Sequence, residues 1–137
     1  IRWRQNALKA KLARDGIIEA PNGSRRVFFG RKDDAGTQRE AFAYTPQVMT
    51  TYCTELAWRA MWYDPENVGP GGERICQPLL LVHDSIVFQW PKERTDWVKA
   101  RIPAWFNNEV NIAGTKLVVP YAGGYGRSWG EETEGNL

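Results

Sequence analysis

The sequence has no long hydrophobic run. Its longest unbroken aliphatic stretch is Leu79–Val82, whereas a membrane-spanning helix needs about 18–20 apolar residues. We therefore expect a soluble chain with no membrane partner. The sequence begins at Ile1, and no apolar signal-peptide core follows it. We expect a chain that is either processed or part of something larger.

Cysteine and histidine are also scarce. The two cysteines, Cys53 and Cys76, are too few and too widely spaced for a disulfide framework or a zinc ribbon. We expect both to be reduced core residues of a cytoplasmic protein, and a bridge between them is the less favoured alternative. His83 is the only histidine. Without a matched second ligand, it does not indicate a zinc site.

What the sequence does contain fits one globular domain with an uneven charge distribution. It has 137 residues, of which 42% are hydrophobic and 25% charged, as in ordinary folded domains. Residues 1–32 carry nine Lys and Arg against two acidic residues, a net charge of +7, while the other 105 residues carry −5. A polyanion is the natural partner of such a basic end. A solvated helix face explains the same charges equally well.

Apolar spacing and turn residues predict an α+β domain with an antiparallel sheet. An Asn-Gly pair between β-prone runs is a strong hairpin signal, and a proline inside a helix would kink it. In chain order the expected elements are an amphipathic helix over 1–14 ended by Gly16, a hairpin of strands 17–20 and 24–29, an exposed loop over 31–38, a helix over 41–62 kinked at Pro46, a turn-rich connector over 64–74 with no packed element, a hairpin around 83–85, a helix from Pro91 to about 108, a strand over 116–121, and a loose tail after Trp129.

The second hairpin is the most informative segment. The apolar runs 79–82 and 86–88 are separated only by His83-Asp84-Ser85. Because both runs are unbroken, they predict strands in a central sheet that helices cover. A carboxylate at such a tip suits a Mg²⁺ ion, although a lone Asp there is more often only a turn residue. The three polar residues cannot form a catalytic triad, because side chains of consecutive residues point apart.

Several segments resemble family A (polymerase I type) DNA polymerases. Leu81-Val82-His83-Asp84-Ser85-Ile86 is similar to motif C, usually V-H-D-E followed by an aliphatic residue. The order and spacing of the matches agree over nearly the whole chain. The other matching segments are the helix around Trp3, the turn Gly23-Ser24-Arg25-Arg26, the segment from Arg39 to Gln47, Val119-Pro120, and Gly126 to Glu131, which is similar to the tail of phage members.

The resemblance implies a C-terminal palm and fingers fragment of a phage-like DNA polymerase, built on an antiparallel palm-type sheet. Residues 1–38 would form a basic helix and hairpin, and residues 39–137 the palm segment with motif C. Asp84 would bind the catalytic Mg²⁺ ions and His83 would lie against the primer end.

The resemblance also implies contacts with primer-template DNA. Arg39 and Gln47 would contact it from the minor-groove side, where readout depends little on sequence. Arg25 and Arg26 would contact backbone phosphates. Ala43 stands where many members have Asn, which puts one minor-groove contact in doubt.

The sequence departs from the family in what it lacks. Ser85 replaces the usual Glu of motif C, and nothing matches the motif A aspartate or the helix that binds the nucleotide phosphates. Two-metal phosphoryl transfer needs carboxylates that hold two ions about 3.5–4 Å apart. We therefore expect an N-terminal polymerase chain to supply the second aspartate, share two Mg²⁺ ions with Asp84 and bind the dNTP.

Such a fragment should expose apolar surface where the missing palm strands belong, with some of its seven Trp in that interface and others in its own core. The alternative function is a non-catalytic nucleic-acid-binding or scaffolding subunit with a degenerate palm fold.

Overall fold

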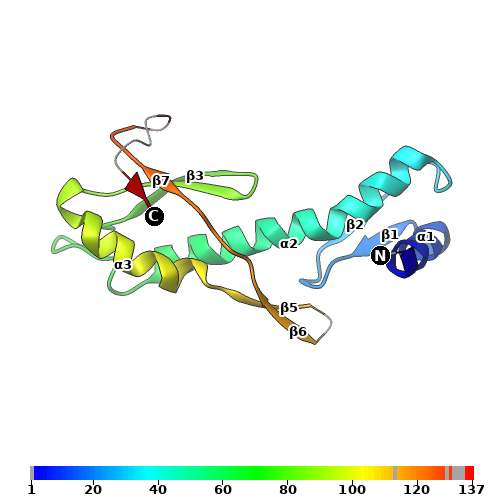
Figure 1. Ribbon diagram of the computed structural model, residues 1–137, viewed down its shortest axis with the longest axis horizontal. Coiled ribbons are helices and arrows are strands. Elements are labelled where there is room, and N and C mark those ends of the chain that lie inside the picture. The colour runs from blue at the N-terminus through cyan, green and yellow to red at the C-terminus, as the bar shows by residue number, and fades with distance from the viewer. Residues whose placement is uncertain (1, 113, 129, 131–134) are drawn as a thin grey trace. The chain divides into compact units, whose positions relative to one another are not determined.

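The computed structural model describes residues 2–112, 114–128, 130 and 135–137. It forms two compact units, residues 1–52 and 53–137, and helix α2 contributes to both. The described elements are helices and short antiparallel strands, so the α+β class is confirmed (Figure 1). In chain order they are α1 (Arg2–Asp15), β1 (Ile17–Glu19), β2 (Arg25–Val27), α2 (Ala35–Tyr63), β3 (Gln77–Val82), β4 (Ser85–Gln89), the 3₁₀ helix η1 (Lys92–Arg94), α3 (Thr95–Phe106), β5 (Glu109–Ile112), β6 (Thr115–Val118), β7 (Gly124–Tyr125) and β8 (Gly135–Asn136).

The first unit confirms the predicted helix and hairpin. Gly16 has a φ of 65° and its N–H donates to the Leu12 carbonyl at 2.9 Å, as a glycine that ends a helix does. Strands β1 and β2 pair antiparallel, with Gly23 at a φ of 86° in the turn. The core of this unit consists of Leu12, Ile18, Phe28 and Ala41.

Helix α2 begins earlier than the sequence pattern predicts. Asp34 accepts the N–H of Thr37 on its side chain at 2.9 Å and the N–H of Gln38 on its carbonyl at 3.0 Å, which is an N-cap. The expected loop over 31–38 is therefore wrong for its second half. Pro46 lies inside the helix, which continues to Tyr63. The proline carries no backbone N–H, so one hydrogen bond of the helix ladder is missing there.

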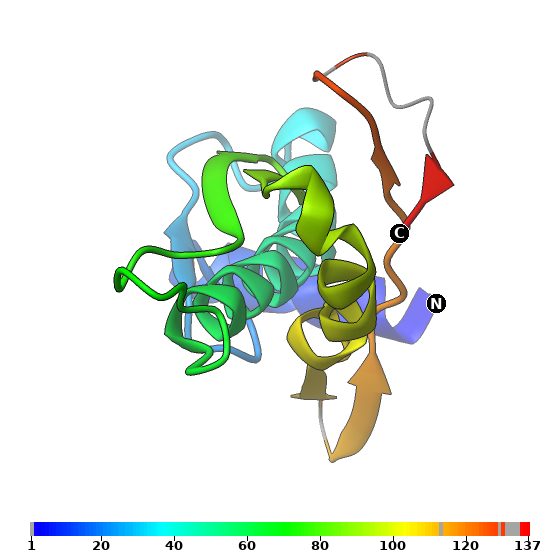
Figure 2. The same cartoon turned by 90° about the vertical axis from the view of Figure 1, so that its left-hand side faces the viewer.

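The second unit is built around the last turns of α2 and helix α3, which lie side by side (Figure 2). Its buried core consists of Met61, Cys76, Val98, Ile102 and Trp105. Aromatic side chains surround this core, and Phe88, Trp90, Phe106, Tyr121 and Tyr125 contact one another in a chain of tilted rings.

The expected central sheet is not present in the described part of the chain. Strands β3 and β4 form a two-stranded sheet by themselves, as do the other three strand pairs. The leucine side chains of β3 are not covered: Leu79, Leu80 and Leu81 are 54%, 42% and 38% exposed. The prediction that helices cover both strands is therefore wrong. An unbroken apolar strand is typical of a sheet whose two faces are both covered, and β3 lacks such cover in the described part of the chain.

Two further segments differ from the sequence prediction. Strand β5, which pairs with β6, was not predicted, although Val110 and Ile112 alternate with polar residues as in a half-buried strand, because four residues are a short run for such a signal. The tail was expected to be loose, yet residues 135–136 pair with β7. Trp129 itself lies outside the described residues.

Cys76 is a core residue as expected, whereas Cys53 is only half-buried and belongs to neither core cluster. Cys53 and Cys76 are free thiols, half-buried and buried, and burial raises the pKa of Cys76 to about 12. Trp105 is buried, whereas Trp3 and Trp62 are largely exposed, so tryptophans lie both in the core and on the surface. None of the helices in the described ranges is long and apolar enough to cross a membrane.

Candidate functional site

The candidate site is the tight turn between β3 and β4. Val82 pairs with Ser85, so His83 and Asp84 form a two-residue turn. His83 has a φ of 54°. A positive φ at the first central position occurs in hairpin turns of the II′ type, where glycine is usual. An L-residue there costs about 1–3 kcal/mol and occurs most often at functional sites. His83, Asp84 and Ser85 are all exposed.

A buried threonine of α2 holds this turn. Thr54 is 7% exposed, and its hydroxyl Oγ1 donates to the main-chain carbonyl of Asp84 at 3.1 Å. The bond fixes the backbone of Asp84 and leaves its side chain unused. No hydrogen bond or ion pair reaches the Asp84 carboxylate from the residues that the structure describes. The role of Thr54 was not predictable from the sequence, because a lone Thr inside a helix carries no signal for a partner 30 residues away.

The root of the hairpin is held by a buried asparagine in the connector. Asn67 is 0% exposed. Its side-chain amide donates to the carbonyls of Met61 at 2.9 Å and Cys76 at 2.8 Å, and its Oδ1 accepts the Cys76 N–H at 2.7 Å. One side chain thus joins the end of α2 to the residue just before β3. The connector contains no helix or strand, as expected, but the sequence did not predict that its side chains Asp64 and Asn67 are buried.

Asp64 anchors the same connector to α3. Its Oδ2 accepts hydrogen bonds from Arg101 Nε at 3.1 Å, from Arg101 Nη2, and from the indole Nε1 of Trp105 at 2.7 Å. Its Oδ1 accepts the Glu66 N–H at 2.9 Å. Burial opposes the charge of Asp64, but the hydrogen bonds from Arg101, Glu66 and Trp105 outweigh it and lower the pKa of this carboxyl.

The turn contains one carboxylate that could act as a metal ligand. The Asp84 carboxylate is exposed, held by its backbone and without a competing cation, which fits one ligand of a Mg²⁺ ion that takes its other ligands from water and phosphates. Within the described ranges, no three His, Cys, Asp or Glu side chains gather in one place. A site for two ions therefore needs carboxylates beyond this turn.

The predicted primer-template residues of α2 lie in the first unit. Arg39 and Gln47 are both exposed and stand eight residues apart, which corresponds to a rise of about 12 Å along a helix. Ala43 lies between them and is half-buried. Both side chains are therefore accessible from solvent.

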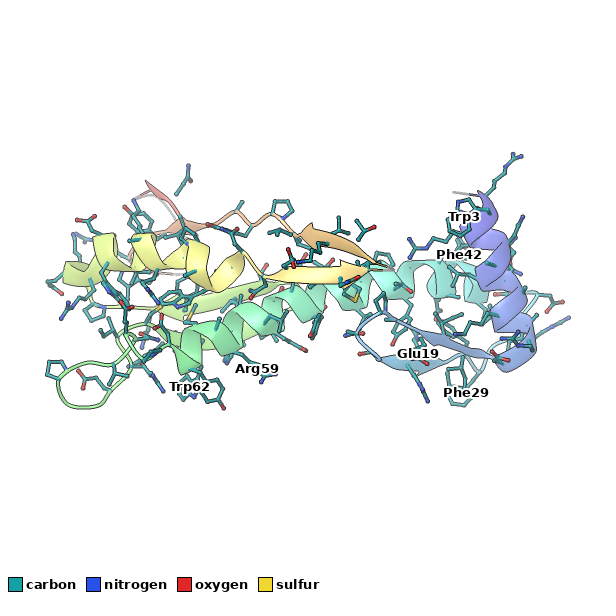
Figure 3. The ribbon with its side chains drawn as sticks, turned by 90° about the horizontal axis from the view of Figure 1, so that it is seen from below. Trp3, Glu19, Phe29, Phe42, Arg59 and Trp62 are labelled. Atoms are coloured by element: carbon teal, nitrogen blue, oxygen red, sulfur yellow. The ribbon has the colours of Figure 1, made fainter. Side chains whose placement is uncertain are left out.

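Arg25 and Arg26 are already engaged by acidic side chains of their own unit. Arg25 Nε lies 2.9 Å from Glu19 Oε2 (Glu19 is labelled in Figure 3), and Arg26 Nη2 lies 2.8 Å from Glu40 Oε2. The Arg26 guanidinium also lies 4.9 Å from the centre of the Phe28 ring. Such exposed pairs contribute only about 0–1 kcal/mol. Their expected contact with phosphates would require exchanging these partners.

Comparison with known proteins adds no further constraint: no family model, curated protein or solved structure matches the chain.

Proposed function

We propose that the chain supplies the motif C aspartate of a family A DNA-directed DNA polymerase and acts together with an N-terminal polymerase chain. The observation that carries the proposal is Asp84: a free carboxylate at the tip of a two-residue hairpin turn, held through its main chain by Thr54. A polar side chain whose only role was to form a turn would bond its own neighbouring backbone, and none of the hydrogen bonds found for Asp84 in the described residues does so.

The exposed leucines of β3 support the requirement for a second chain. Leu79, Leu80 and Leu81 expose apolar surface next to the turn. Among the described residues, β3 and β4 pair only with each other, so each has a free edge that could accept another strand. A palm sheet completed by the partner chain would bury these leucines and bring a second carboxylate to the hairpin tip.

In this proposal each residue of the turn has a defined task. Asp84 would hold two Mg²⁺ ions together with a carboxylate of the partner chain; when bound, one ion would activate the primer hydroxyl and the other would stabilise the leaving pyrophosphate. His83, with its unusual backbone angle, would lie against the primer end. Arg39 and Gln47 would contact primer-template DNA from one side of α2. Thr54 would keep the carboxylate in a fixed position, which catalysis by positioned charge requires.

The decisive experiment is primer extension by the complex that co-purifies with this chain. Asp84→Asn keeps the size of the side chain and removes its charge. We expect extension with Mg²⁺ and dNTPs to fall at least about a thousandfold, since losing a metal ligand removes several kcal/mol of transition-state stabilisation. Binding of primer-template DNA should remain.

Asp96→Asn is the matched control, because Asp96 is an exposed carboxylate in the first turn of α3. It should leave extension unchanged. An Asp84→Asn complex that extends primers as well as the wild type would remove the catalytic assignment. A wild-type complex that binds DNA and never extends a primer would instead indicate the non-catalytic nucleic-acid-binding subunit.

A further inference from the structure

The first unit carries a shallow depression whose lining includes three basic side chains. Helix α1 forms one side, and the chain leading into α2 forms the other. Three cationic side chains face one acidic side chain there, so the local charge is positive. The lining residues are Lys9, Ala10, Ala13, Arg31, Lys32, Asp33 and Gln38.

Among the described residues, no ion pair is found for Lys9 or Lys32, and Arg31 has one exposed acidic partner. Lys9 Nζ lies 5.9 Å from the centre of the Phe42 ring (Figure 3), a cation–π contact that positions the ammonium group. Lys32 lies over Gly16, where an added Cβ would lie 3.2 Å from its Nζ. Arg31 reaches only Asp33, at 3.5 Å, and both of these side chains are more than three-quarters exposed. An exposed pair of this kind is easily exchanged for a phosphate.

An exposed aromatic ring precedes two of these cations in the chain. Phe29 is 94% exposed and points away from its unit (Figure 3). It is two residues from Arg31, so their Cα atoms lie within about 7 Å. A single exposed apolar residue is unremarkable by itself. An open ring next to clustered cations is the arrangement with which proteins bind single-stranded nucleic acids, stacking a base on the ring and pairing phosphates with the cations.

We propose that this surface binds single-stranded DNA, with Phe29 stacking on a base and Lys9, Arg31 and Lys32 contacting the phosphates. The inference rests on the proposed function only in taking DNA as the partner. In this proposal Lys9, Arg31 and Lys32 make the main phosphate contacts of the basic end. Arg25 and Arg26 do not, because their guanidinium groups are paired with Glu19 and Glu40.

The stacking contact is tested with two probes that share one backbone. The full chain is titrated into fluorescein-labelled oligothymidylate and into an abasic strand of equal length, both about 20 nucleotides, enough to cover a typical site. The wild-type chain should bind the strand that has bases more tightly. Phe29→Ala should weaken that binding about 5- to 150-fold, the usual value of one stacked base, and leave binding to the abasic strand unchanged.

The phosphate contacts are tested by salt dependence. Replacing Lys9, Arg31 and Lys32 together by Gln should lower the slope of log K against log salt by about 2 on both strands, since each phosphate contact contributes about 0.7 for single strands. A duplex of equal length distinguishes a stacked single strand from a general polyanion, because paired bases cannot stack on Phe29.

Two control variants match these changes. Val27→Ala removes an exposed apolar side chain of the same unit that has no ring. Arg14→Gln removes a cation of α1 that is paired with Asp15 at 2.7 Å and does not line the depression. Neither control should change affinity or salt slope by more than experimental error.

The inference is overturned if the wild type binds both strands equally, or if Phe29→Ala has no effect or the same effect on both strands. It is also overturned if a duplex binds as tightly as oligothymidylate with the same loss in Phe29→Ala. An unchanged salt slope in the triple variant would overturn it as well. These results are independent of the Asp84 test. If Asp84→Asn abolishes extension while Phe29→Ala binds normally, only the single-strand site is wrong. If base-selective binding holds while Asp84→Asn extends normally, only the polymerase proposal is wrong.

Discussion

Replacing Asp64 should be the most destabilising single change in the second unit outside its apolar core. The side chain of Asp64 is 3% exposed, and two nitrogens of Arg101 and the indole of Trp105 donate to the same oxygen. In Asp64→Ala, the indole N–H of Trp105, a residue that is 1% exposed, would lose the one acceptor found for it among the described residues. An unsatisfied buried donor costs about 1–3 kcal/mol.

The loss at Arg101 adds less than a fully buried ion pair would. Breaking such a pair costs about 3–5 kcal/mol, but the Arg101 side chain is 27% exposed and can turn toward water. We therefore expect Asp64→Ala to lower the free energy of unfolding by about 2–4 kcal/mol in total. Domains are stable by only about 5–15 kcal/mol, so the change is large. Asp64→Asn should lose less, because one amide oxygen can accept either the Arg101 and Trp105 donors or the Glu66 N–H, but not both sets.

Urea unfolding followed by tryptophan fluorescence measures this directly, since Trp97 and Trp105 contact each other within the affected core at a ring separation of 6.0 Å. With a slope of about 2 kcal/mol per molar urea, the midpoint for Asp64→Ala should fall by about 1–2 M. A shift below about 0.3 M, which that slope converts to about 0.6 kcal/mol, would refute the role assigned to this network.

The pH dependence has a definite sign. Hydrogen bonds from Arg101, Glu66 and Trp105 lower the pKa of Asp64 in the folded chain, so its contribution is complete above the unfolded value near about 4. It is lost as pH falls through the folded pKa. The difference between wild type and Asp64→Asn should therefore stay constant from neutral pH to about 5 and shrink below about 4. A difference that grows toward acid pH would contradict this reasoning.

Two further predictions concern the turn itself. His83→Gly should raise the free energy of unfolding by about 0.5–1 kcal/mol, because glycine relieves the left-handed backbone strain at a small entropic cost. Primer extension by this variant should nevertheless fall. If urea unfolding shows His83→Gly to be less stable than the wild type, the turn is not strained at His83. Thr54→Val should lower stability by about 0.5–1.5 kcal/mol and speed amide exchange in the turn. Thr51→Val is its control, because the Thr51 hydroxyl donates to the carbonyl of Gln47 within α2. Equal effects of the two variants would show that Thr54 does not hold the turn.

Local structure was predictable where one residue type decides the backbone. Gly16 ends α1 and Asn22-Gly23 turns the first hairpin, because each needs a conformation that few residues adopt. The His83-Asp84 tip was predictable for a related reason: two apolar runs with a short polar interval leave room only for a tight turn. The start of α2 was also encoded, in the cap residue Asp34, but the glycine and polar residues around it resemble a loop.

Long-range contacts were not predictable in the same way. Asp64 and Arg101 are 37 residues apart, and Asn67 lies among prolines and glycines that indicate a solvated turn. A sequence read without structure assigns such polar residues to the surface, because burial of a polar group becomes favourable only when every hydrogen bond finds a partner. The prediction for β3 failed for the opposite reason: an unbroken apolar run indicates a strand covered on both faces, whereas Leu79, Leu80 and Leu81 are exposed.

The distribution of polar partners in the second unit also bears on function. Asp64 and Asn67, at the root of the hairpin, use their side-chain oxygens fully within the chain. Within the part of the chain that the structure describes, Asp84, at the tip, is held through its main-chain carbonyl and not through its carboxylate. A hairpin fixed at both ends by groups other than its tip carboxylate can present that carboxylate at a constant position without lowering its capacity to bind a cation. Thr54→Val and Asp84→Asn should therefore impair extension for different reasons: the first by loosening a position that excess Mg²⁺ partly restores, the second by removing a ligand that no Mg²⁺ concentration replaces.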